Sequence, residues 1–261
     1  MNLPVEQLRE FLEEKYRQYN RPEFIETDPV SIPHLFTKKE DREIIGFLTA
    51  TLAWGQRPTI LRNARQLALW MDDDPHAFIL SFTPKDLKAF QSFVHRTFNG
   101  TDAVFFLKSL QRIYRQHGSM EEVFAAGLSR NKNSLAFGIH HFRNEFFTLK
   151  HASRTEKHVA DPLRNSSAKR ICMFLRWMVR KDKSGVDFGI WNTISAAWLQ
   201  PPLDLHSGAT ARNIGLLNRT QNDWKAVEEL GENLRKLDPY DPVKFDFALY
   251  GLGVFEGFNK S

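Results

Sequence analysis

Residues 163–180 read LRNSSAKRICMFLRWMVR, a short polar turn that runs directly into a basic, amphipathic segment. Within this segment, apolar residues recur every three or four positions, at Ile171, Phe174, Leu175 and Met178. That period is typical of an α-helix with one apolar face. We therefore expect a helix over about 166–180, entered through a turn at 163–168.

The same helical period extends outward in both directions along the chain. Apolar residues follow it in 44–52, 60–71, 102–114 and 224–237, whereas no stretch alternates apolar and polar residues as a half-buried strand would. The sequence predicts an all-α fold of about ten helices, one of them over Val186–Leu199. With 42% hydrophobic and 26% charged residues in 261, the composition is that of an ordinary globular protein.

Several classes of protein are excluded by what the sequence lacks. No apolar run approaches the roughly 20 residues that span a bilayer, so no membrane partner is expected. The acidic, amphipathic start of the chain differs from a secretory signal. The single cysteine, Cys172, excludes an internal disulfide and a cysteine-ligated iron–sulfur cluster or zinc site. The adjacent His140 and His141 point apart on a helix and cannot chelate together. We expect a cytoplasmic protein without metal or cofactor.

Positive charge is concentrated in one segment. Between residues 164 and 183, seven lysines and arginines face one acid, Asp182, which gives this segment a charge of +6 against +5 for the whole chain. The basic residues are Arg164, Lys169, Arg170, Arg176, Arg180, Lys181 and Lys183. Such a block indicates a surface for a polyanion, although a solvated helix face is the simpler alternative.

Two residues in these segments carry side chains suited to catalysis. Lys169 stands in the first turn of the predicted helix, where the helix dipole and neighbouring cations favour a neutral, reactive amine. Asp204 lies just before Ser207, a candidate helix N-cap, so its carboxylate would face the donors of a helix start and stay ionised. The alternatives are an exposed surface lysine and an aspartate that only caps a helix.

These residues resemble the helix-hairpin-helix superfamily of DNA glycosylases, which includes endonuclease III and 8-oxoguanine glycosylase. The turn 163–169 is similar to the superfamily's hairpin L-P-G-V-G-x-K, and 202–206 (PLDLH) to its P-V-D-x-H segment. Residues 44–67 resemble its L-I-x-x-x-L-S-x-Q-x-x-D segment, and 247–253 its last helix. The order and the spread over about 40–255 support the resemblance.

The resemblance implies a two-lobed helix-hairpin-helix fold over residues 1–261. The lobe with the hairpin and the catalytic pair would span roughly 100–215, and the N- and C-terminal helices would form the other lobe. It also implies a DNA glycosylase with AP lyase activity that acts as a monomer, associated with the nucleoid, on double-stranded DNA containing a damaged base, with 8-oxoguanine as the expected lesion.

The implied roles fall on residues from three regions. Lys169 and Asp204 would be catalytic, and Gln56 would fill the space left by a flipped base. Further contacts to the base or the DNA backbone are expected from Trp54, Arg57, Asn165, Ser167, Arg170, Phe174, Arg176, Arg180, Trp191 and His206.

The sequence departs from the superfamily's pattern at several places. Asn165 and Ser167 replace the two hairpin glycines, Lys169 and Asp204 are 35 residues apart, and no cluster-binding cysteines follow. These features are most similar to the archaeal 8-oxoguanine glycosylase branch and to a bacterial family of uncharacterised proteins. A non-catalytic nucleic-acid-binding protein on the same scaffold and a helical protein-interaction module remain alternatives.

Overall fold

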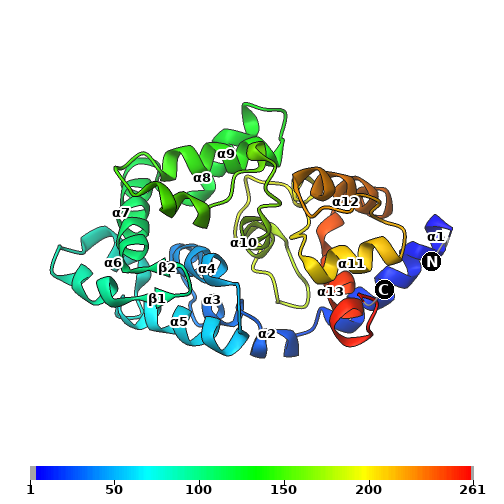
Figure 1. Cartoon of the computed structure of the whole chain (residues 1–261), viewed down its shortest axis with the longest axis horizontal. Coiled ribbons are helices and arrows are strands. Elements are labelled where there is room, and N and C mark those ends of the chain that lie inside the picture. Colours follow the sequence, from blue (N-terminus) through cyan, green and yellow to red (C-terminus); the bar gives the residue numbers. More distant parts are fainter. Residues whose placement is uncertain (1–3, 260–261) are drawn as a thin grey trace. The chain divides into compact units, whose positions relative to one another are not determined.

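The computed structural model describes residues 4–259, which fold mainly into α-helices (Figure 1). The predicted all-α class is confirmed, with one addition that the sequence did not indicate. Strands β1 (Val94–His95) and β2 (Phe98–Asn99) pair antiparallel as a minimal hairpin, with Val94 opposite Asn99.

The chain forms two compact units. Unit 1 combines 1–26 with 161–261, and unit 2 is the continuous segment 27–160. This division differs from the expected lobe of about 100–215, because residues 100–160 belong to unit 2, while the hairpin and both candidate catalytic residues belong to unit 1 together with the terminal helices.

Unit 2 consists of helices that surround an aromatic core. Its elements, besides the β-hairpin, are α3 (Ser31–His34), α4 (Lys39–Leu52), α5 (Arg57–Leu69), α6 (Pro75–Ser81), η1 (Asp86–Ser92), α7 (Gly100–His117), α8 (Met120–Ser129), α9 (Leu135–Phe146) and η2 (Ser153–His158). Phe47 of α4 stacks on Phe106 of α7 and meets the edges of Phe142 and Phe146 of α9. Most phenylalanines of this unit therefore serve packing, which is their usual role.

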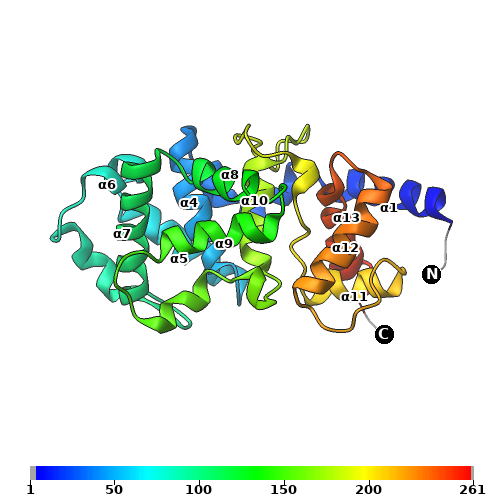
Figure 2. The same ribbon diagram turned by 90° about the horizontal axis from the view of Figure 1, so that it is seen from above.

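Unit 1 brings together helices from both ends of the chain. Its elements are α1 (Val5–Tyr19), η3 (Pro162–Arg164), α10 (Lys169–Val179), η4 (Ala196–Trp198), α11 (Leu205–Asn213), α12 (Trp224–Leu237), η5 (Pro242–Lys244) and α13 (Phe245–Phe255). The short α2 (Glu23–Thr27) spans the boundary between the units. Helix α13 packs against both α1 and α11 (Figures 1 and 2). Gly251 permits the first contact, since a Cβ there would lie 2.1 Å from the Tyr19 ring.

The helix predicted over Val186–Leu199 is wrong. In the structure this segment is irregular apart from the single turn η4, Ala196–Trp198. Four of its apolar residues, Val186, Trp191, Ile194 and Leu199, are nevertheless buried. Trp191 is 1% exposed and meets the edge of the Phe174 ring. The apolar positions indicated burial correctly, but a segment can bury such side chains without regular hydrogen bonding. Trp191 and Phe174 are therefore core residues and not surfaces for a flipped base.

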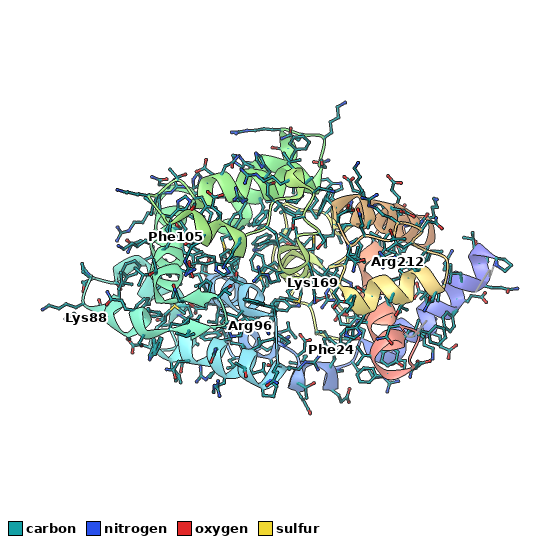
Figure 3. The ribbon with its side chains drawn as sticks, in the orientation of Figure 1. Phe24, Lys88, Arg96, Phe105, Lys169 and Arg212 are labelled. Carbon is teal, nitrogen blue, oxygen red and sulfur yellow. The ribbon has the colours of Figure 1, made fainter. Side chains whose placement is uncertain are left out.

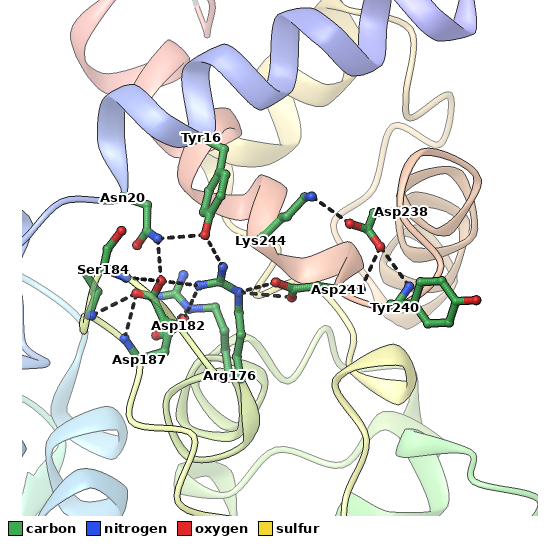
Figure 4. A network of polar contacts seen from close by, with 12 residues as sticks. Tyr16, Asn20, Arg176, Asp182, Ser184, Asp187, Asp238, Tyr240, Asp241 and Lys244 are labelled. Carbon is green, nitrogen blue, oxygen red and sulfur yellow. Dashed lines mark hydrogen bonds and ion pairs between the residues drawn. The ribbon is translucent and has the colours of Figure 1, made fainter.

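Two arginines of α10 and its C-cap lie inside unit 1, within a network of carboxylates (Figure 4). Arg180, 1% exposed, donates to both oxygens of Asp241 at 3.0 and 2.9 Å and to Asp187 at 3.0 Å. Its remaining Nη donates to the Tyr16 hydroxyl at 2.6 Å. Arg176, 4% exposed, donates to Asp187 at 3.3 Å and to Asp246.

This network corrects the expectation that Arg176 and Arg180 bind DNA phosphates. Burial alone disfavours their charge, but Asp187 and Asp241 outweigh it and raise the pKa of Arg180 above its ordinary value. Asp241 precedes η5, but its carboxylate binds Arg180 and makes no capping hydrogen bond. Part of the basic block is thus neutralised inside the fold.

We expect Arg180→Met to lower the free energy of unfolding by about 3–5 kcal/mol, because it removes the arginine that binds Asp241 and one of the two arginines that bind the buried Asp187 carboxylate. Urea denaturation followed by circular dichroism measures the change. Arg9→Met is the matched control, since the Arg9 and Glu6 side chains are 53% and 79% exposed and lie 3.7 Å apart; an exposed pair contributes about 1 kcal/mol or less. Equal effects of the two substitutions would contradict this account of the network.

Candidate active site

The turn that leads into α10 is held by two residues in the left-handed region. Asp161 caps η3 through the Leu163 N–H, and Asn165 follows at φ 62° and ψ 24°. Ala168, the N-cap of α10, has φ 46° and ψ 30°. Asparagine tolerates this region whereas alanine rarely adopts it, so the surrounding contacts must hold Ala168. The element before the turn is the three-residue η3, not an α-helix.

The turn is fixed to the start of α12. The Asn165 side-chain amide donates to Asp223 Oδ2 at 3.0 Å, and the Trp224 N–H donates to the Asn165 carbonyl at 3.4 Å. Ser166 forms an isolated bridge with Asp223. The exposed Asn165 therefore positions the turn through its side chain, while Ser167 is half-buried within it.

Lys169 and Asp204 meet, although 35 residues separate them. The Lys169 Nζ lies 3.0 Å from Asp204 Oδ2, and the two side chains are 36% and 18% exposed. Lys169 is the first residue of α10 and Asp204 immediately precedes α11 (Figure 3). The amine and the carboxylate thus form an ion pair that both solvent and a ligand can reach.

Asp204 is the N-cap of α11, which is one of the two alternatives that the sequence left open, and Ser207, the other candidate N-cap, is the third residue of the helix. Asp204 Oδ1 accepts from the Ser207 N–H at 2.8 Å, and the Ser207 hydroxyl accepts from the Asp204 N–H at 2.9 Å. This reciprocal pair is a capping box. Burial raises the pKa of Asp204, but the Lys169 charge and the Ser207 donors outweigh it, so the pKa lies below its ordinary value and the carboxylate is ionised at neutral pH.

Three residues that sequence reasoning missed support Asp204 from behind. The Asn222 side-chain amide donates to the Asp204 carbonyl at 2.9 Å, and Arg212 donates to Asn222 Oδ1 at 2.6 Å. Gly208 leaves room for them, since a Cβ there would lie 2.8 Å from Asn222 Oδ1. No local pattern pairs Asn222 with Asp204, because the contact joins residues 18 apart across a loop.

Asp246 is a fourth residue of this region that the sequence did not indicate. It is 7% exposed, accepts a hydrogen bond from Arg176, and interacts electrostatically with both Asp204 and Lys169. Burial, opposed by Arg176, raises its pKa from 3.8 to about 6. A carboxyl group that titrates near neutrality therefore lies close to the ion pair.

The remaining candidates of unit 1 are placed less decisively. Arg170 is half-buried, and its burial lowers its pKa to about 10. His206 is exposed, and its Nδ1 lies 2.6 Å from the Asn259 side-chain amide. The neighbouring Leu205 is 76% exposed, an unusual state for a leucine. Only its place directly after Asp204 could have drawn attention to it.

The other three candidates belong to unit 2, where α4 gives way to α5. Trp54 is half-buried beneath the Arg96 guanidinium, which lies 4.6 Å from its ring centroid. Gln56 is exposed and is the N-cap of α5, with no capping hydrogen bond from its side chain, and the half-buried Arg57 begins that helix. These residues lie in a different unit from Lys169 and Asp204.

Within the described residues 4–259, no three histidine, cysteine or acidic side chains gather in a way that would hold a metal ion. No helix in the same range is long and apolar enough to cross a bilayer.

We expect Asp204→Ala to lower the free energy of unfolding by about 0.5–2 kcal/mol, since the cap of α11 is lost. Asp204→Asn should cost less, because asparagine caps a helix about as well as aspartate. Thermal unfolding of both variants makes the comparison. Equal losses for Asn and Ala would show that the charge, which both variants lack, and not the cap, dominates the structural role of Asp204.

The raised pKa of Asp246 also has a consequence for stability. In the unfolded chain the group titrates near 3.8 and in the folded chain at about 6, so the folded state binds more protons between these values. Stability from this group therefore falls as pH rises from 4 to 6. Asp246→Asn should flatten this part of the curve of unfolding free energy against pH, as measured by urea titrations; an unchanged curve would contradict the assignment.

Comparison with known proteins gives one match. No curated protein and no solved structure matches the chain. A family model described as "Protein of unknown function (DUF2400)" matches residues 28–255, which is most of the sequence. The chain therefore belongs to the DUF2400 family.

Proposed function

We propose that this protein is a DNA base-excision glycosylase with AP lyase activity, and that it removes a damaged base such as 8-oxoguanine. The observation that carries the proposal is the contact of 3.0 Å between Lys169 Nζ and Asp204 Oδ2 at the edge of two helices. A primary amine beside an ionised carboxylate, both partly exposed, is the pair that a Schiff-base glycosylase requires.

The two groups would divide the chemistry between them. The Asp204 carboxylate stabilises the positive charge that develops on the sugar as the glycosidic bond breaks. The ion-paired Lys169 ammonium gives one proton to the departing base, which also takes the electron pair of the broken bond, and the freed nitrogen bonds to C1′. A second proton then passes from this nitrogen to the ring oxygen, which leaves C1′ and gives a protonated Schiff base. Loss of a C2′ proton expels the 3′ phosphate.

The start of α10 suits the DNA backbone. The N-cap Ala168 makes no side-chain hydrogen bond to the helix, and a helix start favours an anion. The exposed cations of the basic block, Arg164, Lys181 and Lys183, can add phosphate contacts. This assignment replaces the buried Arg176 and Arg180.

A base in a duplex must leave the stack before the amine can reach its sugar, at a cost of a few kcal/mol. Gln56 is the candidate for the vacated space, because its side chain is exposed at the start of α5. Trp54 and Arg57 would lie beside it along the chain.

The alternative is a nucleic-acid-binding protein whose Lys169–Asp204 pair is only structural. The capping box of Asp204 and Ser207 favours it, because this carboxylate would be useful to the fold without any chemistry. Trapping of a covalent intermediate separates the two functions.

We expect sodium borohydride to trap a covalent complex between the protein and a duplex that contains one damaged base. A panel of duplexes with one lesion each, including 8-oxoguanine, is screened by gel electrophoresis. Lys169→Gln should abolish trapping and keep DNA binding. Asp204→Asn should slow excision by about 100-fold or more, the size of effect seen when an electrostatic stabiliser is lost.

Lys236→Gln is the matched control, since Lys236 is an exposed lysine of α12 that lies outside the basic block; it should trap normally. Full excision by Lys169→Gln would mean that water attacks the sugar and that the lyase step is absent. Failure of the wild-type protein to excise any lesion, with binding retained, would favour the structural role.

A further inference from the structure

Unit 2 contains a cavity of about 560 Å³, far along the chain from the ion pair of unit 1. One wall is a face of α7 and the other is the segment after α6 together with η1, and Leu149, from the segment after α9, completes the lining. The volume falls within the range of about 300–1,000 Å³ typical of sites for small organic molecules.

The frame of the cavity is fixed by side chains of α7 that bind the end of α6. The Gln111 amide donates to the Ile79 carbonyl at 2.9 Å, and Arg115 donates to the Leu80 carbonyl at 2.7 Å. Helices α6 and α7 pack together, as do α7 and η1. The space is therefore bounded by anchored elements.

The lining combines apolar surface with positive charge and includes no acid. Phe82, Leu87, Val104 and Leu149 supply the apolar surface. The cations, Lys108, Arg112 and Arg115, lie on the same face of α7. A small anion without an apolar body would make no use of the apolar surface. An uncharged molecule would make no use of the three cations.

The three cations differ in what already neutralises them. Arg112 donates to Glu145 Oε2 at 3.0 Å, and this hydrogen bond is the largest cause of the lowered pKa of Glu145. Lys108 and Arg115 form no ion pair with a carboxylate in the described part of the chain, 4–259. Over the same residues, the buried Nε of Arg112 has no hydrogen-bond acceptor, which is a costly state for a buried donor.

We propose that this cavity binds an organic anion with an apolar body, such as a medium-chain carboxylate. The apolar body would pack among Phe82, Leu87, Val104 and Leu149. Its carboxylate would face Lys108 and Arg115, where hydrogen bonds between charged groups are strong. The proposal is independent of the proposed glycosylase activity, whose candidate catalytic residues lie in unit 1.

The test is isothermal titration of the full chain with three probes. Decanoate, below its micelle-forming concentration, has both the charge and the apolar body. Decyltrimethylammonium has the same ten-carbon chain with the opposite charge, and inorganic phosphate has the charge alone. We expect saturable one-to-one binding of decanoate, at least tenfold tighter than that of either other probe. No binding of decanoate, or equal binding of the cationic probe, would overturn the proposal.

Lys108→Glu tests the charged wall without disturbing the fold, because Lys108 is exposed. It should weaken decanoate binding by tenfold or more. Lys88→Glu is the matched control: Lys88 is an exposed lysine of η1 that does not line the cavity and extends from the edge of the ribbon (Figure 3). An equal loss in both variants would mean that net charge, and not this cavity, governs binding.

Discussion

The structure of unit 1 depends on one constraint: the two buried arginines at the end of α10 must each pair with a carboxylate. A buried guanidinium without a carboxylate costs several kcal/mol. A shift or rotation of α10 by one residue would break these ion pairs and incur that cost. Arg180 joins α10 to Asp241 at the start of η5 and to Tyr16 of α1, and Arg176 joins it to Asp246 of α13. Because Lys169 stands at the other end of the same helix, the network also fixes the amine of the candidate active site.

The helices were predictable from the sequence because the apolar period is local and a helix satisfies its own backbone. The burial and neutralisation of part of the basic block could not be predicted in this way. The net charge of a 20-residue segment takes no account of acidic residues elsewhere in the chain. Asp241 and Asp246 lie 61 and 70 residues from the arginines that they neutralise. For the segment Val186–Leu199 the error was of another kind. Its apolar residues correctly predicted that part of it is buried, but they did not reveal that its backbone is irregular.

The candidate site was predictable to the extent that a resemblance supplied it. The sequence patterns named Lys169 and Asp204, and their contact in the structure supports that pairing. Spacing alone did not decide whether Asp204 is a helix cap or a catalytic residue. In the structure its Oδ1 caps α11, and its Oδ2 accepts a hydrogen bond from Lys169. Asn222 and Asp246 could not be predicted, because each reaches the site through a tertiary contact that no local pattern encodes.

The order in which the chain leaves the ribosome affects the two units differently. Unit 2 is continuous and has all its residues once position 160 has emerged, so it can fold while synthesis continues. Unit 1 must hold α1 available until α13, its packing partner, has been made. Loss of α13 would therefore also leave α1, at the other end of the sequence of unit 1, without its packing partner.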